Sequence, residues 1–505
     1  MTHQDTPSRV VRESIVYGSG VFLSQFLSAV RGLVVAGLLG ESRYGLWKSL
    51  QVGFDYLAYC HFGILHGMAR RIPAFRSEGR TKEERSARRM SLFTTLGSAL
   101  LAGLTLVLLT SGLERRVWRL WIGIAVLLLP SQLYRFLTWV CLVDGRFTLL
   151  SCADVSLAIV SFAVMWWFVP SSGVYGVFLG LGVGCLCALA LGWYCGVFSS
   201  SPSRTEEARA FGAWGLFRDL VVVGFPFMLV DGLFVFWQRI DRVILVTLYG
   251  AESRELGHYG LAVMVASFAI QIPQTLMRVL FRRTLSSVSS ENLGQNPTDP
   301  NLRKHIVLPT VAVAGTTPLL FGMGTVCSWA VIRLFLPLFV GAEASIALLM
   351  LACYWCSIGL SVRNLYTAMD RQWRLGGIYS IAILATVAVT YAAMEWGGDG
   401  RSPGIAVGAI GMIAGSVAFA LISLADNCRL MRFTARQFAS LLFQTGVPFV
   451  LFLAWVWWAV ASRLAWDGGT GNGLERLWQE MGTCVLLTGP PAIWSTVYVL
   501  RRGNG

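Results

Sequence analysis

Long apolar runs recur from one end of the chain to the other, separated by short polar segments. Each run of about 17–25 residues is long enough to cross a hydrocarbon core of about 30 Å as a helix. The pattern therefore predicts an all-α, polytopic membrane protein with about fourteen transmembrane helices. The predicted spans are 14–38, 44–66, 90–112, 117–141, 147–169, 173–197, 216–249, 257–282, 306–336, 343–368, 374–395, 403–426, 439–462 and 477–499.

The composition agrees with this pattern, because 55% of the residues are apolar and only 13% are charged. A soluble protein carries about a quarter charged residues and could not cover so apolar a chain with polar groups. The first apolar run is too long for a cleaved signal and is expected to remain as a helix. Cys353 and Cys356 form a C-x-x-C pattern inside a predicted span without partner ligands, so we expect neither a metal site nor a disulfide framework.

The basic residues predict an orientation. Of the Lys and Arg residues in the loops or at the very ends of the spans, 25 fall on the N-terminal side of the membrane and 8 on the other. The positive-inside rule then places both termini in the cytoplasm. The same asymmetry accounts for most of the net charge of +14, which argues against a nucleic-acid partner.

A weak internal repeat organises the spans. RGLVVAGLLG-ESRYG, from Arg31, is similar to DRVILVTLYGAESRELGHYG, from Asp241, and Gly40 aligns with Gly250. Six spans separate the copies, so they share one orientation, as in many transporters with a substrate site between the halves. The expected domains are an N-lobe at 1–215 (spans 1–6), a C-lobe at 216–438 (spans 7–12) and a C-terminal helix pair at 439–505 (spans 13–14).

Several segments resemble one family of membrane proteins. They are GLLGESRYGLWKSLQ, HFGILHGMARRIPAFRSEG, WQRIDRVILVTLYGAESRELGHYGLAVMVASF, and VIRLFLPLFVGAEAS followed by NLYTAMDRQW. Together they look like the polysaccharide-biosynthesis (O-antigen) flippases, the lipid-linked oligosaccharide exporters of the multidrug/oligosaccharidyl-lipid/polysaccharide exporter superfamily. The resemblance runs over roughly residues 10–380, and the last spans fit by hydropathy only.

The resemblance implies two six-helix lobes around a central cavity. It also implies a substrate, an undecaprenyl-diphosphate-linked oligosaccharide moved to the outer leaflet by alternating access for surface polysaccharide or lipopolysaccharide biosynthesis. Polysaccharide polymerase and chain-length proteins are the implied partners, and no cofactor is implied. The additional pair 439–499 is similar to the plan of the lipid II flippase, in which an added helix pair lines a groove for the lipid tail.

Charged side chains within spans are costly and usually face a polar cavity. Eight basic residues and four clear acids fall within the spans, an excess of positive charge that suits a diphosphate, and Arg can form two hydrogen bonds to phosphate oxygens. The candidate substrate-binding residues are Arg31, Lys48, Gln51, Arg239, Arg242, Gln271, Gln274, Arg278 and Arg363. The candidate ion-coupling residues are Asp55, Asp231 and Asp241.

Structural alternatives remain open for several of these residues. Lys48 and Arg333 lie near the predicted outer ends, and Arg278 and Arg363 near the inner ends, where long side chains can reach the headgroups. The acids and Arg242 could instead form ion pairs with charges on neighbouring helices. For His61 and His66 we expect a surface position.

Two other functions also stay open. One is a multidrug or small-molecule antiporter of the same superfamily, although the excess of cations disfavours cationic drugs. The other is a membrane-bound polysaccharide polymerase or ligase, which the short external loops disfavour. No nucleotide-binding glycine loop and no catalytic motif stands out, so we expect a transporter driven by an ion gradient or the membrane potential rather than an enzyme.

The predicted orientation can be tested by cysteine labelling. In a variant without reactive native cysteines, Arg80→Cys should be protected from a membrane-impermeant maleimide in intact cells, and Thr470→Cys should react. Permeabilised cells provide the control, in which both sites should react. The reverse pattern would contradict the orientation.

Overall fold

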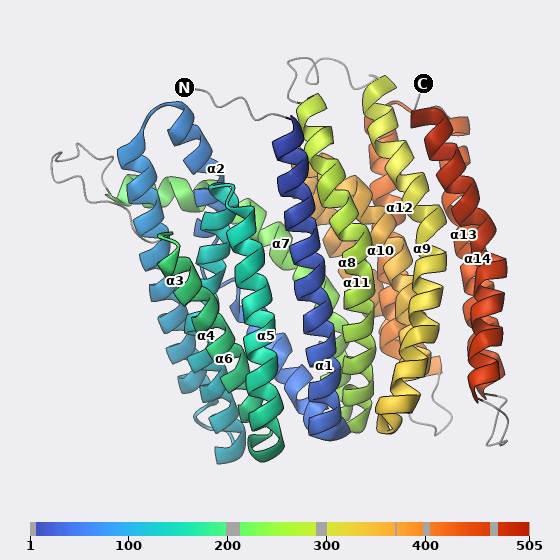
Figure 1. The fold of residues 1–505 in the computed structure, drawn as a ribbon, viewed down its shortest axis with the longest axis horizontal. Coiled ribbons are helices and arrows are strands. Elements are labelled where there is room, and N and C mark those ends of the chain that lie inside the picture. The colour runs from blue at the N-terminus through green and yellow to red at the C-terminus, as the bar shows by residue number, and fades with distance from the viewer. Residues whose placement is uncertain are drawn as a thin grey trace. The chain divides into compact units, whose positions relative to one another are not determined.

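The computed structural model describes residues 7–197, 213–288, 300–368, 371–396, 404–464 and 473–503. Within this part of the chain the regular structure is helical, without strands, and the predicted all-α polytopic fold is confirmed (Figure 1). The helices are α1 (Pro7–Leu57), α2 (Ile64–Ser77), α3 (Thr81–Thr110), α4 (Arg115–Val143), α5 (Phe147–Ser172), α6 (Val174–Tyr194), α7 (Ala213–Tyr249), α8 (Arg254–Val288), α9 (Pro300–Phe335), the 3-10 helix η1 (Pro337–Ala342), α10 (Glu343–Ala368), α11 (Gln372–Trp396), α12 (Ala406–Leu430), α13 (Ala435–Leu464) and α14 (Gly473–Gly503).

Among the described residues, 12 helices are long and apolar enough to cross a membrane. The chain divides into two compact units, Met1–Phe236 and Trp237–Gly505. The boundary falls inside α7, so the first unit holds α1 to α6 and the start of α7, and the second holds the remainder. The predicted division into residues 1–215, 216–438 and 439–505 stays a prediction.

The glycines aligned by the repeat occupy the same kind of position in each unit. Gly40 interrupts α1 with φ 70° and ψ 173°, and so separates the first two predicted spans. Gly250 follows the last residue of α7 with φ 84°. Side chains with a Cβ rarely adopt this left-handed region, which explains glycine at both points. The aligned Tyr44 and Tyr259 are both buried, so the sequence repeat has a structural counterpart.

The second predicted span, 44–66, is interrupted rather than continuous. Its helix ends at Leu57, residues 58–63 form turns, and α2 begins at Ile64. Phe62 and Gly63 both have positive φ, 49° and 83°. Gln132 of α4 donates its side-chain amide to the carbonyl of Leu57 at 3.3 Å and to that of Ala58 at 3.0 Å. The helix ends here and leaves backbone carbonyls without partners inside it. The side chain of Gln132 supplies hydrogen bonds to two of them.

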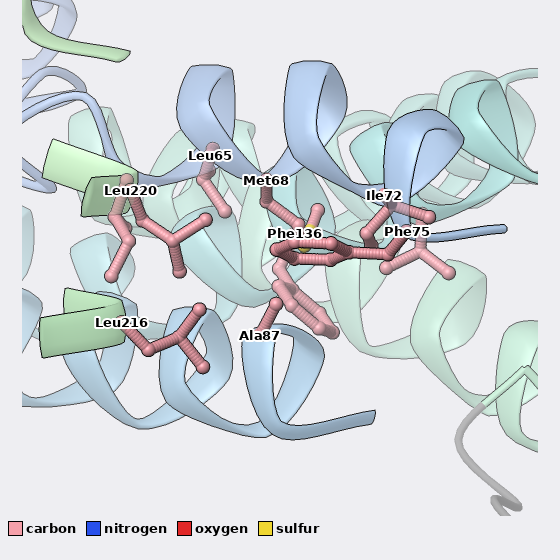
Figure 2. Close-up of a cluster of buried hydrophobic side chains, with 10 residues drawn as sticks. Leu65, Met68, Ile72, Phe75, Ala87, Phe136, Leu216 and Leu220 are labelled. Carbon is pink, nitrogen blue, oxygen red and sulfur yellow. The ribbon is translucent and has the colours of Figure 1, made fainter. Parts of the chain in front are cut away.

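The helix after this break buries one face in the core of the first unit. Figure 2 shows side chains of α2 meeting side chains from α3, α4 and α7. The labelled residues of this cluster are Leu65, Met68, Ile72, Phe75, Ala87, Phe136, Leu216 and Leu220. Arg76, at the end of α2, and Arg88 of α3 both hydrogen-bond Asp144, which follows α4. Burial raises the pKa of Asp144, but these two hydrogen bonds outweigh it and the pKa is lowered overall.

Glycines let α2 and α7 approach very closely. A Cβ added at Gly67 would lie 1.9 Å from the carbonyl oxygen of Leu220, and one at Gly224 would lie 2.0 Å from that of Gly63. These clashes involve backbone atoms, which cannot move aside as a flexible side chain can. Close approach of backbones at small residues is a main source of helix association in lipid, where no hydrophobic effect joins the helices.

The second unit is built around α10, which packs against α8, α9, α12 and α13. Its residues from Leu349 to Leu360 are all buried. The C-terminal pair is part of this unit, since both α13 and α14 pack against α9 (Figure 1). Gly315 and Gly322 of α9 lie against Ser495 and Cys484 of α14, where an added Cβ would come within 2.1 Å and 2.3 Å of their side chains.

The glycine crossing of α2 and α7 generates a matched test. Gly224→Ala should destabilise the protein by about 1–3 kcal/mol, because the new methyl group has no space. Gly232→Ala, in the same helix, meets nothing closer than 3.9 Å and should be neutral or stabilising. Thermal midpoints of the detergent-purified variants measure the difference. Equal midpoints would show that the crossing is looser than described.

Candidate functional site

Arg31 faces the interior of the first unit. Its guanidinium donates a hydrogen bond to the hydroxyl of Ser161 on α5. On the neighbouring helices, Tyr134 of α4 donates to the carboxylate of Asp154 on α5. The structure therefore places the Arg31 guanidinium against a serine hydroxyl of its own unit.

Lys48 and Gln51, predicted to share a face, do contact each other. The Lys48 ammonium donates to the side-chain oxygen of Gln51 at 3.0 Å and lies 5.1 Å from the centre of the Tyr44 ring. Lys48 is buried, so contact with headgroups is not its main environment. Asp55 follows on the same helix, two residues before the helix ends at Leu57, and is partly exposed.

His66 is the main residue whose position was predicted wrongly from the sequence. The expected surface position is wrong for both histidines of this segment, since His61 is 2% and His66 is 8% exposed. The Nε2 atom of His66 lies 3.2 Å from the carboxylate of Asp231 on α7. Nothing in the local sequence indicates this pair, because it joins residues 165 positions apart. The available signal was a histidine inside an apolar span together with an acid inside another.

Asp241 and Arg242 are almost completely buried in the second unit, at 1% and 2% exposure. The Asp241 carboxylate accepts a hydrogen bond from Tyr259 of α8 at 2.6 Å and one from the backbone amide of Arg242 at 2.7 Å. The Arg242 guanidinium donates to the carbonyl of Gln238 at 2.7 Å. The neighbouring helix thus supplies Asp241 with a tyrosine, whereas the structural alternative left open for the pair was an ion pair with a charge on a neighbouring helix.

A cavity of about 60 Å³ lies within the second unit, between α7, α8, α10 and α12. Its polar lining includes Arg239, Gln238, Asp241, Ser267 and Ser416. One water needs roughly 10–15 Å³ of such volume, so the cavity has room for a few waters or a small ion. Drug-sized ligands need about 300 Å³ or more, and an oligosaccharide is larger still.

The remaining candidates lie on α8 and α10. Gln271 and Gln274 are partly exposed and do not line this cavity. Arg363 of α10 is also partly exposed. The side chain of Arg278 lies outside the described residues. The structure thus brings Arg239 and Asp241 to one cavity and does not bring the glutamines of α8 to it.

A buried charge network ties the C-terminal helix pair to α9 and α10. Arg333 binds Glu343 through two hydrogen bonds of 2.7 Å and 3.0 Å. Arg463 of α13 bonds to Glu343 at 2.8 Å and to Glu480 of α14 at 2.8 Å. The side chains of Arg463, Glu343 and Glu480 are 7%, 9% and 1% exposed. The Arg463 guanidinium also covers the ring of Trp329, 3.8 Å from its centre.

No protein-family model and no curated protein matches the chain. Solved structures do match it. A point mutant of the Vibrio cholerae MATE transporter VcmN is similar, with a TM-score of 0.60 at 12% identity over 85% of this chain and 98% of that chain. The lipid II flippase MurJ, in an inward closed conformation, gives 0.59 at 13% identity over 96% of this chain and 98% of that chain. The eukaryotic MATE transporter AtDTX14 gives 0.57 at 15% identity over 85% and 99%.

At these identities the likeness establishes the fold. The chain has the polytopic membrane fold of the MATE transporters and of MurJ, the fold of the superfamily that the sequence motifs resemble. Membership of this superfamily, and of the O-antigen flippases within it, stays a prediction.

The charge network gives a test of how firmly the C-terminal pair is held. Glu480→Ala leaves the buried Arg463 with fewer anionic partners and should lower stability by about 3–5 kcal/mol. Glu395→Ala, at an exposed position near the end of α11, is the control and should change little. Thermal unfolding in detergent, followed by limited proteolysis between α13 and α14, measures both effects. An unchanged midpoint for Glu480→Ala would show that the network does not anchor the pair.

Proposed function

We propose that the protein is a flippase that moves an undecaprenyl-diphosphate-linked oligosaccharide across the cytoplasmic membrane for surface polysaccharide biosynthesis. The observation that carries the proposal is the extent of the fold. The lipid flippase MurJ matches 96% of this chain, whereas the MATE transporters match 84–86%. The difference between these shares is about the length of a helix pair such as α13 and α14. Here that pair is part of the second unit.

The charges within the helices support an anionic substrate. Arg31, Lys48 and Arg239 place cations within apolar helices, where a diphosphate that leaves water needs compensation. Arg239 lines a polar cavity, whereas Arg242 is held by carbonyl and carboxylate groups of its own helix. Of these two predicted residues, we therefore assign contact with the substrate to Arg239 rather than to Arg242.

The second unit's cavity is about 60 Å³, which has room for water or a small ion near Asp241 but not for a glycan. In the proposal, Arg239 therefore meets the diphosphate in another conformation of the alternating-access cycle, in which this cavity is wider. A polyprenyl tail can stay in lipid during the passage, so only the diphosphate and sugars need a polar route. A groove for the tail beside α13 and α14 is part of the proposal.

A multidrug transporter is the second candidate. The fold of the MATE transporters matches as well as that of MurJ, with TM-scores of 0.60 and 0.59. The two candidates differ in the charge that the substrate must carry. A cationic drug would need acids in the route, and the intramembrane charge of this chain is mainly basic.

Transport by reconstituted protein discriminates the candidates. Proteoliposomes should translocate a fluorescent undecaprenyl-diphosphate oligosaccharide, measured by loss of protection from dithionite, and should not move ethidium. Arg239→Ala should reduce the rate at least about tenfold, since a charge-assisted bond to phosphate contributes about 1.5–3 kcal/mol. Arg119→Ala, at an exposed position near the start of α4, is the matched control and should keep the wild-type rate. Ethidium transport without lipid translocation would favour the second candidate and contradict the first.

A further inference from the structure

A histidine–aspartate pair lies next to the break in the second span. His66 lies in the first turn of α2, and its Nε2 atom is 3.2 Å from the Asp231 carboxylate of α7. A carboxylate accepts hydrogen bonds, so Nε2 carries the hydrogen in the neutral ring. The other ring nitrogen, Nδ1, is buried and has no hydrogen-bond partner among the residues that the structure describes. It is therefore a basic atom with its lone pair available inside the protein.

The groups around this pair come from three segments of the same unit. From the turn, the His61 ring lies 5.7 Å from the His66 ring, and its Nδ1 accepts a hydrogen bond from the Gly63 amide at 3.2 Å. From α4, Trp139 lies 4.8 Å from the His66 ring. Arg135, also from α4, lies 6.0 Å from the Tyr59 ring and interacts electrostatically with His61.

The contact between α2 and α7 continues beyond the pair. One turn further along α2, Arg71 bonds to Asp219 of α7 and Arg70 covers the Phe227 ring at 3.7 Å. Tyr59 donates to the backbone carbonyl of Asp231 at 3.5 Å. Asp231 thus faces the imidazole of His66, and Arg70 and Arg71 of the same helix also contact α7.

We propose that His66 and Asp231 form a proton site of this transporter, with Nδ1 of His66 as the atom that takes the proton. The proposal rests on the proposed ion-driven transport and names the ion. The proton converts the neutral pair into an imidazolium–carboxylate pair, and the charge of Asp231 compensates the added charge. A hard metal cation prefers oxygen ligands, so a carboxylate that faces an imidazole suits a proton better than sodium.

Proton binding at Nδ1 creates a need for a new contact. The added N–H is buried without an acceptor, and a buried unpaired donor is unfavourable. The turn at 58–63 can respond, because Phe62 and Gly63 already hold left-handed backbone conformations. The other side of the contact is α7, the helix that continues from the first unit into the second. A proton at this point therefore acts on a discontinuous span and on a helix that both units share.

The proton site is tested without any substrate. The chain has only 5 histidines, so imidazole resonances of isotope-labelled protein in nanodiscs can be followed against pH by NMR. We expect His66→Gln to remove a resonance that titrates. Asp231→Asn should weaken proton binding at His66 about tenfold or more, because the opposite charge is lost. The resonance of His258, in the second unit, is the internal control and should be unaffected by the Asp231→Asn substitution.

Two results would overturn the proposal: a His66 resonance that does not titrate, or one whose midpoint is the same in Asp231→Asn. Should His66→Gln fail to fold, Trp139→Phe assigns the resonance instead, since it changes the ring-current shift from the aromatic ring 4.8 Å away. Asp231→Glu keeps the charge and should retain most of the proton affinity.

Coupling is a separate measurement in proteoliposomes. Translocation of the fluorescent lipid-linked oligosaccharide should respond to a pH gradient in the wild type and should not respond in His66→Gln. An undiminished response in His66→Gln would contradict the coupling role of the site. If the wild type moves no lipid-linked oligosaccharide, the proposed function fails, while the titration still decides whether the proton site exists.

Discussion

A backbone amide or carbonyl without a partner is very costly at the depth of a bilayer, and the break in the second span has to meet this constraint. The carbonyls of Leu57 and Ala58 accept hydrogen bonds from Gln132, and the Gly63 amide donates to His61. The break therefore depends on α4, which supplies Gln132. With the break in place, α2 can turn away from the line of α1 and bury its apolar face against α3, α4 and α7.

Buried charges are subject to the same constraint, because each of them also needs a partner inside the protein. The paired acids described here have a hydrogen-bond donor from a different helix: Asp231 from His66, Asp241 from Tyr259, and Glu480 from Arg463. Breaking such a pair leaves an uncompensated charge, so these pairs fix which helices are neighbours even where their net contribution to stability is small. A cation held this way is less available to a substrate. This separates Arg242, enclosed by its own helix, from Arg239, which lines a cavity.

The sequence was informative where the signal is local. Runs of apolar residues predicted the helices, and the repeat predicted that Gly40 and Gly250 would take equivalent positions. Hydropathy could not find the break at 58–63, because its residues are nearly as apolar as the helix before them. It also could not find the partner of His66 or the network around Glu343, since both join residues far apart in the chain. His66 was expected at the surface and Glu343 was not among the candidate residues, so only the packing showed that these side chains meet.

The C-terminal helix pair illustrates how two weak forces combine in a membrane. In lipid, apolar side chains gain nothing by leaving the solvent, so α14 must be held to α9 by close packing and by polar contacts. The first is provided along the helix by Gly315 and Gly322, which admit side chains of α14. The second is provided at one end by Arg463 and Glu480, which join α13 and α14 to Glu343. Packing without the charges would leave that end of the pair free to separate, and the charges without packing would leave the rest of α14 unattached. Because both are present, the pair behaves as part of the second unit, which is the condition that a lipid-tail groove between these helices would require.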